Sequence, residues 1–149
     1  MGMKLYYREQ GKVKIDMTDY LKKILDNLPD KYQVKVITPA ANHSFEVNGT
    51  TRKLSERDAQ AFHTIVAKLL FLCKRARPYI LTGVALLRTG VIYPDKDDDK
   101  KLVRILKYHS GTRDIILTLE HNGSWHGKIV GGRGVRGPSR HEEPHLQGD

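Results

Sequence analysis

The spacing of apolar residues changes several times along the chain, and each change predicts an element. Between residues 3 and 17, apolar and polar residues alternate on both sides of Gln10-Gly11, which predicts a β-hairpin. From Thr18, an expected N-cap, the apolar positions follow helical spacing up to Leu28, and Pro29 comes next. The segment YQVKVI (32–37) predicts a short strand that Thr38-Pro39 ends.

The strongest helical pattern begins at Ser55, where the spacing S-x-x-D is a start signal. Pro78 ends or bends this helix. Residues 79–89 predict a second apolar helix. Asp95 to Asp99 precede a third, with Gly111 as its expected C-cap. The inward positions of the first helix are Ala59, Phe62, Ile65, Val66, Leu69, Leu70 and Cys73, and those of the third are Leu102, Ile105, Leu106 and Tyr108.

The C-terminal part predicts a second hairpin. DIILTLE (114–120) is its first strand, Asn122-Gly123 its turn, and WHGKIV (125–130) its second strand. Residues 131–149 are rich in Gly, Arg and His and poor in apolar groups, so we expect disorder there. The predicted fold class is α+β, with an N-terminal hairpin, a helical middle, a short C-terminal hairpin and a disordered tail.

Composition adds a charge argument to this outline. The 149 residues include 26 Lys and Arg against 17 Asp and Glu, a formal net charge of +9, which favours nucleic acid or another polyanion as the partner. Cys73 is the only cysteine, and its apolar surroundings predict a buried thiol rather than a nucleophile. The sequence shows neither a signal-peptide core nor an apolar run of about 20 residues, so we expect an intracellular protein without a membrane partner.

Two patterns near the C-terminus suggest chemistry that their contexts oppose. Residues 132–137 spell G-x-G-x-x-G, but no apolar helix follows and no acidic residue stands about twenty positions on. His141-Glu142-Glu143-Pro144-His145 spells H-E-x-x-H, but Pro144 opposes the helix that would bring both imidazoles to zinc. We therefore predict no cofactor, no metal and no small-molecule substrate for this chain.

The middle of the chain resembles a known family. The segments Phe62–Ile80, Gly83–Leu87 and Pro94–Leu119 are similar to the region of copia-type retrotransposon polyproteins between the reverse-transcriptase palm and the RNase H domain. The resemblance covers roughly residues 2–122 and includes Thr38–Asn48, which is similar to a linker in some members. The matching positions are Leu69, Leu72, Arg77, Pro78, Ile80, Arg104, Leu106, Tyr108, Gly111, Thr112 and Asp114.

The resemblance implies a division into parts and a parent activity. Residues 1–53 would be the end of the palm with a linker, 54–122 a helical thumb-like or connection-like region, and 123–149 the tail. The intact family is an RNA-directed DNA polymerase with RNase H that uses Mg²⁺. Its catalytic aspartates would lie upstream of "MGMKL", so this fragment is expected to be no enzyme. Tyr79 and His109 replace the usual Asp and Leu, which indicates relaxed constraint.

The tail also has an explanation within this resemblance. A codon choice compatible with Ile129–Leu146, read one base later, gives SWVDAAFAVHPDMKSHT, which is similar to the start of the family's RNase H domain. Our hypothesis is that residues 123–149 are a frameshifted tail. Both patterns near the C-terminus would then be accidents of the reading frame.

Two functions from different classes remain open. The first is a reverse-transcriptase fragment that retains at most sequence-independent contact with an RNA or DNA template–primer. The alternative is a small, stand-alone basic module for nucleic-acid binding or assembly, which would show a stable core and a basic stripe on one face. The residues predicted to contact nucleic acid are Lys12, Lys14, Lys68, Lys74, Arg75, Arg77, Arg104 and Lys107.

Overall fold

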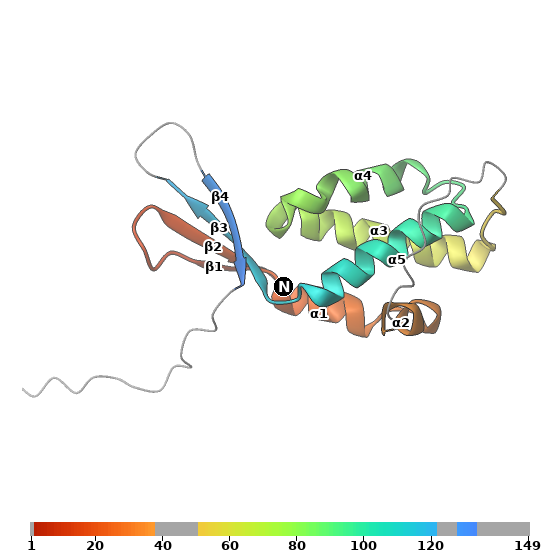
Figure 1. Cartoon of the computed structure of the whole chain (residues 1–149), viewed down its shortest axis with the longest axis horizontal. Coiled ribbons are helices and arrows are strands. Elements are labelled where there is room, and N and C mark those ends of the chain that lie inside the picture. Colours follow the sequence, from red (N-terminus) through yellow and green to blue (C-terminus); the bar gives the residue numbers. More distant parts are fainter. Residues whose placement is uncertain (1, 38–50, 122–127, 134–149) are drawn as a thin grey trace, which may run out of the picture.

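The computed structural model describes residues 2–37, 51–121 and 128–133, and over these ranges the chain is α+β. A helical body is formed by α1 (Thr18–Asp26), α2 (Asp30–Ile37), α3 (Glu56–Ala76), the 3-10 turn η1 (Pro78–Ile80), α4 (Leu81–Thr89) and α5 (Lys96–Gly111). An antiparallel sheet projects from one end of this body (Figure 1). Its strands are β1 (Lys4–Tyr6), β2 (Lys12–Asp16), β3 (Ile115–Glu120) and β4 (Lys128–Arg133). The predicted fold class is confirmed.

The sheet joins the two ends of the described chain. Its strand order is β1-β2-β3-β4, and Ile15 of β2 stands opposite Leu117 of β3. Gly11 has a φ of 76°, which the β1–β2 turn requires and other residues adopt at a cost. Its carbonyl accepts a 2.7 Å hydrogen bond from the His121 amide, so the turn is also tied to the end of β3.

The predicted N-terminal hairpin is therefore confirmed, but our expectation of an isolated hairpin is wrong. If the hairpin is the end of a palm, as the resemblance implies, it is expected to lack its sheet neighbours and to expose its edges. Instead, residues 117–120 of β3 pair along β2, with Lys12 opposite Glu120 at one end of the ladder. Local sequence patterns give strands but not their long-range partners, and this explains the error.

Short polar side chains set the helix starts. Ser55 is the N-cap of α3, as predicted, because its hydroxyl accepts from the Asp58 amide. Asp95 caps α5 in a reciprocal arrangement with Asp98. At α1 the prediction is one position off, since Met17 is the N-cap. Asp16 fixes Thr18 there, accepting from its amide at 2.8 Å and its hydroxyl at 2.7 Å.

The segment 32–37 is a helix, and its prediction as a strand is wrong. The carbonyl of Pro29 accepts from the amides of Tyr32 and Gln33, which starts α2 directly after the proline. Tyr32 is fully buried and Val36 packs partly against the core, four positions on, whereas Val34 is 67% exposed. The alternating apolar letters therefore reflect helical i, i+4 spacing, with tertiary packing deciding over β propensity.

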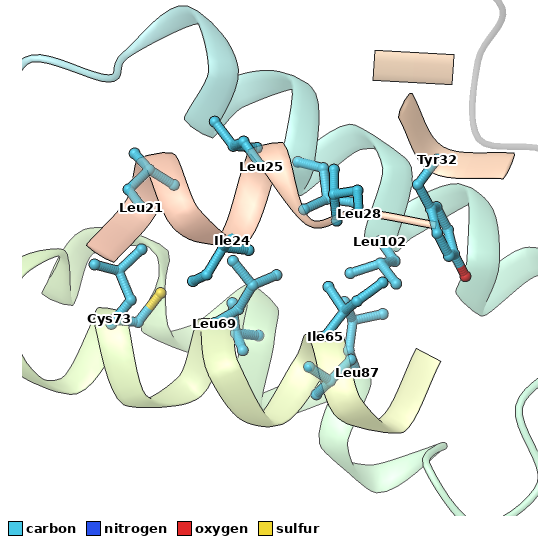
Figure 2. Packing of buried hydrophobic residues seen from close by; sticks show 14 of the residues in the cluster. Leu21, Ile24, Leu25, Leu28, Tyr32, Ile65, Leu69, Cys73, Leu87 and Leu102 are labelled. Atoms are coloured by element: carbon cyan, nitrogen blue, oxygen red, sulfur yellow. The ribbon is translucent and has the colours of Figure 1, made fainter. Parts of the chain in front are cut away.

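The hydrophobic core lies between the helices, and α3 runs through its centre. Side chains of α1, including Leu21 and Ile24, point toward Leu69 and Cys73 of α3 (Figure 2). Leu87 of α4 and Leu102 of α5 complete the same cluster. Each such side chain stabilises the fold by roughly 1.5–3 kcal/mol through removal from water. The core therefore spans residues on both sides of the boundary expected at residue 53.

Several predictions about the C-terminal part need correction. Gly111 is the last residue of α5 rather than a C-cap, since Thr112 occupies that position and Gly111 has no positive φ. Tyr108 was expected to face inward but is 45% exposed. The end of β4 includes residues 131–133, which were expected to be disordered. The predicted turn at 122–123, the linker at 38–48 and the tail beyond 133 lie outside the described residues.

None of the helices in the described ranges is long and apolar enough to cross a membrane.

Candidate nucleic-acid interface

Helix α5 presents a row of cations on the side that faces away from the core. Lys96, Lys100, Arg104 and Lys107 are spaced by four, four and three residues, which places them along one stripe of a helix with roughly 3.6 residues per turn. The buried residues of α5 include Leu102, Leu106 and His109, and these lie on its opposite side. From Lys96 to Lys107 the stripe is about 17 Å long, at a rise of about 1.5 Å per residue. We call these four residues the α5 stripe.

The acidic residues at the start of α5 serve mainly in capping and packing. Asp95 caps the helix and also accepts from the Thr51 hydroxyl at 2.6 Å, which is the main reason that its pKa is lowered. Asp97 pairs with Lys101 at 2.7 Å. Asp99 points inward and is 5% exposed. The run DKDDDK thus serves helix capping and packing, while its two lysines face outward.

Further cations adjoin the N-terminal end of the α5 stripe. The backbone of residues 52–54 runs beside that of 94–96, with the Leu54 amide donating to the Pro94 carbonyl at 3.0 Å. This pairing brings Arg52 and Lys53 beside Lys96 around an open cleft of about 400 Å³, which Asp58 also lines. Lys53 is held in place because its ammonium donates to the Tyr93 carbonyl at 2.9 Å.

Two tyrosines mark the other end of the α5 stripe. Tyr108 follows Lys107 on α5, and Tyr79 lies in η1. Their ring centroids are 6.4 Å apart and the ring planes meet at 72°, an edge-to-face arrangement. Partial burial is the main reason that the pKa of Tyr79 is raised. Tyr79 is 48% exposed and Tyr108 45% exposed, so both residues remain partly open to solvent.

Arg77 is buried, and its predicted contact with nucleic acid is wrong. Only 1% of the residue is exposed. Its guanidinium donates to the Thr112 hydroxyl at 2.9 Å, and to the carbonyls of Thr112 at 2.7 Å, Arg113 at 3.2 Å and Ile115 at 3.4 Å. Burial is also the main reason that its pKa is lowered. Arg77 therefore holds the α5–β3 turn against the end of α3 and is out of reach of a ligand.

His109 completes this buried cluster as a neutral imidazole. Its Nδ1 lies 3.4 Å from a guanidinium nitrogen of Arg77, which can only donate, so the imidazole proton belongs on Nε2. Nε2 has no hydrogen-bond partner in the described part of the chain. Burial, reinforced by the Arg77 charge, lowers the pKa of His109 to about 3. The imidazole is thus uncharged at neutral pH.

The remaining predicted contact residues fall into two other groups. Lys12 and Lys14 lie on β2, where Glu9 pairs with Lys12 at 2.8 Å and with Lys14 at 3.6 Å. Lys68, Lys74 and Arg75 lie on the exposed side of α3. The Arg75 guanidinium covers the Phe71 ring at 3.7 Å. The structure thus unites only Arg104 and Lys107 of the predicted set into one stripe.

Sequence reasoning missed Lys96 and Lys100. Both stand in the acidic run before the third predicted helix, where neighbouring aspartates hide them in any local charge average. Their signal is the i, i+4 spacing with Arg104, which becomes apparent only once the helix is extended back to Lys96. Arg52 and Lys53 had no comparable signal, since their approach to Lys96 depends on tertiary structure.

Other groups that could carry chemistry have structural roles. Burial raises the pKa of the Cys73 thiol to about 11, so it is protonated and unreactive at neutral pH. Asp99 accepts from the Tyr32 hydroxyl at 2.5 Å and pairs with Lys31 at 3.1 Å, which ties α2 to α5. Within the described ranges, no group of three or more His, Cys, Asp or Glu side chains is arranged to hold a metal ion.

Comparison of the chain with protein-family models, curated proteins and solved structures gives no match.

Proposed function

We propose that this chain is a non-catalytic, nucleic-acid-binding part of a copia-type reverse transcriptase, from the last palm strands into the thumb or connection region. The observation that carries the binding proposal is the α5 stripe. Its cations project from one rigid helix on the side opposite the core, the arrangement that suits contact with a phosphate backbone. Phosphate contacts position a protein without reading bases, so the proposed binding is independent of sequence.

The family assignment rests on the sequence motifs, and their packing is consistent with it. The matching segments form α3, α4 and α5. Leu69, Leu72 and Leu106, at matching positions, are fully buried. Arg77 and Thr112 come from two separate motifs and are hydrogen-bonded to each other. Sequences that keep this contact keep the helical body as well. The motifs are therefore accounted for by the packing of the fold.

The absence of catalysis remains part of the proposal. Polymerases of this kind transfer nucleotides with two metal ions held by carboxylates, and the segments of this chain that resemble the family do not include those aspartates. The adjacent aspartates of this chain, Asp97 to Asp99, start α5 and bond to neighbouring residues. In the intact family Mg²⁺ would be supplied at the palm, and no residue of this chain is assigned to it.

A stand-alone basic module is the second candidate function. It predicts a cationic stripe on one face, and the α5 stripe has that form. It also predicts a core that needs no further domain. The helices described here share one apolar cluster, to which α1 and α2 contribute alongside α3, α4 and α5. The two candidates agree on the binding surface and differ in the origin of the chain.

Fluorescence anisotropy with labelled duplexes of about 20 base pairs tests the binding proposal. The test variant carries Lys100→Gln, Arg104→Gln and Lys107→Gln. The control carries Lys22→Gln, Lys23→Gln and Arg57→Gln, which remove the same charge from exposed positions elsewhere. We expect the stripe variant to bind at least about tenfold more weakly and to lower the slope of log K against log salt by about 2–3.

The control should bind within about threefold of the original chain, because it changes only the long-range field. Circular dichroism confirms that both variants remain helical. Equal losses in the two variants would show that net charge alone drives binding and that the stripe is no site. Absence of binding by the original chain at low salt would refute the function.

A further inference from the structure

Tyr79 and Tyr108 form an exposed aromatic pair that phosphate contact does not explain. Both residues keep about half of their surface in water, and a partner that covers the rings removes this apolar surface from water, which is favourable. They lie where the α5 stripe ends, because Tyr108 follows Lys107 directly and stands four positions after Arg104. The pair therefore combines an apolar surface with adjacent cations.

The two rings are held in place from beneath. Tyr108 contacts Tyr79 on one side and the buried His109 imidazole on another, with ring centroids 6.1 Å apart. The carbonyl of Tyr108 accepts from the Thr112 hydroxyl at 2.7 Å, and the same hydroxyl accepts from Arg77. Pro78, the residue before Tyr79, opens η1 next to the buried Arg77. A rigid aromatic surface loses little conformational entropy when a ligand covers it.

We propose that Tyr79 and Tyr108 form a stacking platform for an unpaired base of a single-stranded nucleic acid whose phosphates follow the α5 stripe. This inference rests on the proposed function and specifies its ligand. Charge complementarity selects a polyanion, and the open ring surface selects one with exposed aromatic faces. In a duplex each base is covered by its neighbours, so only an unpaired base can stack on a tyrosine. Stacking tolerates any base because each has a π-face.

The test compares single strands with duplexes, using the full chain. The ligands are labelled oligo-dT and oligo-rU of about 20 nucleotides and a DNA duplex of similar length. The variants are Tyr108→Leu, which removes the aromatic ring, Tyr108→Phe, which keeps it, and Tyr7→Leu, a control at a tyrosine that is 68% exposed and lies on the β1–β2 turn. Urea unfolding shows whether each variant remains folded.

We expect Tyr108→Leu to weaken single-strand binding about tenfold and to leave duplex binding within about twofold. Tyr108→Phe and Tyr7→Leu should both bind single strands within about twofold of the original chain. The loss should be the same for oligo-rU and oligo-dT, because stacking does not involve the 2′-hydroxyl. The salt slope should be unchanged, since a ring neutralises no phosphate.

Equal losses on single strands and duplexes, or no loss on either, would overturn the stacking platform while leaving the α5 stripe intact. A loss of equal size in Tyr108→Phe would also overturn it, because the hydroxyl and not the ring would then matter. Failure of the original chain to bind any of the ligands would instead refute the proposed function, and the platform with it.

Discussion

Arg77 stands two positions from Arg75 in a basic cluster, yet the two side chains have opposite environments. Arg75 is on the exposed side of α3, whereas Arg77 follows the last turn of the helix and is directed inward. The sequence predicted both as surface cations, because local charge carries no information on what lies beside a helix end. The partners of Arg77 are mostly backbone carbonyls of residues 112–115, which no side-chain pattern reveals.

His109 makes stability depend on pH in the range where an ordinary imidazole titrates. Its pKa is about 3 in the folded chain, against 6.5 as its ordinary value. Below pH 6.5 the unfolded chain takes up a proton that the folded chain excludes. Stability is therefore complete above that pH and decreases as the pH falls toward 3, by at most about 1.4 kcal/mol per pH unit.

Urea unfolding at about pH 7, 6 and 5 measures this decrease, and the comparison variant is His109→Leu. Between pH 6 and 5 we expect the free energy of unfolding to depend less steeply on pH in the variant, by the slope that corresponds to one proton. Arg77 keeps its bonds to the Thr112 hydroxyl and the carbonyls in that variant. The same slope in both proteins would mean that His109 is protonated or solvated in the folded chain.

The helix α2 shows what decides the type of a short element. Its letters alternate like those of a strand, but the Pro29 carbonyl starts a helix by accepting from the Tyr32 amide, and the Tyr32 side chain binds Asp99 of α5. The longer elements α3 and α5 were predicted to within a few residues because their apolar stripes are long and their N-cap residues Ser55 and Asp95 are explicit. A segment of eight residues without a cap signal is decided by packing.

The Tyr32–Asp99 contact should therefore contribute measurably to stability. We expect Tyr32→Phe to lower the free energy of unfolding by about 1.5–3 kcal/mol, the range for a hydrogen bond to a charged group. Asp99 would keep Lys31 as a partner, which limits the loss. Tyr93→Phe is the matched control, since Tyr93 is 75% exposed and its change should remain within about 0.5 kcal/mol. Urea unfolding of both variants provides the comparison, and equal effects would contradict a specific role for Tyr32.

At the scale of the whole molecule, the sheet pairs β2 with β3, two strands that all of the helices separate in the sequence. The sheet itself lies at one end of the helical body (Figure 1). The strands β1, β2 and β3 were predictable from local apolar patterns, but the ladder between β2 and β3 was not, because nothing local specifies a partner about a hundred residues away. The α5 stripe was half predictable for a related reason. Its lysines are visible in the sequence, while their common direction follows from which side of α5 packs on the core.

The ladder between β3 and β4 includes residues 128–133. Strand β4 pairs with β3 through its backbone, a contact that most sequences can make. The pairing is therefore compatible with the hypothesis that residues 123–149 come from a shifted frame. A chain ending at Arg133 keeps that ladder, whereas one ending at His121 leaves the β3 edge unpaired. An open, partly apolar edge is a template for pairing with another chain.

We therefore expect the 1–121 chain to self-associate with rising concentration in analytical ultracentrifugation, and the 1–133 chain to sediment like the full chain. Self-association of both truncated chains would show that residues beyond 133 protect the sheet, and a monodisperse 1–121 chain would show that β4 is dispensable.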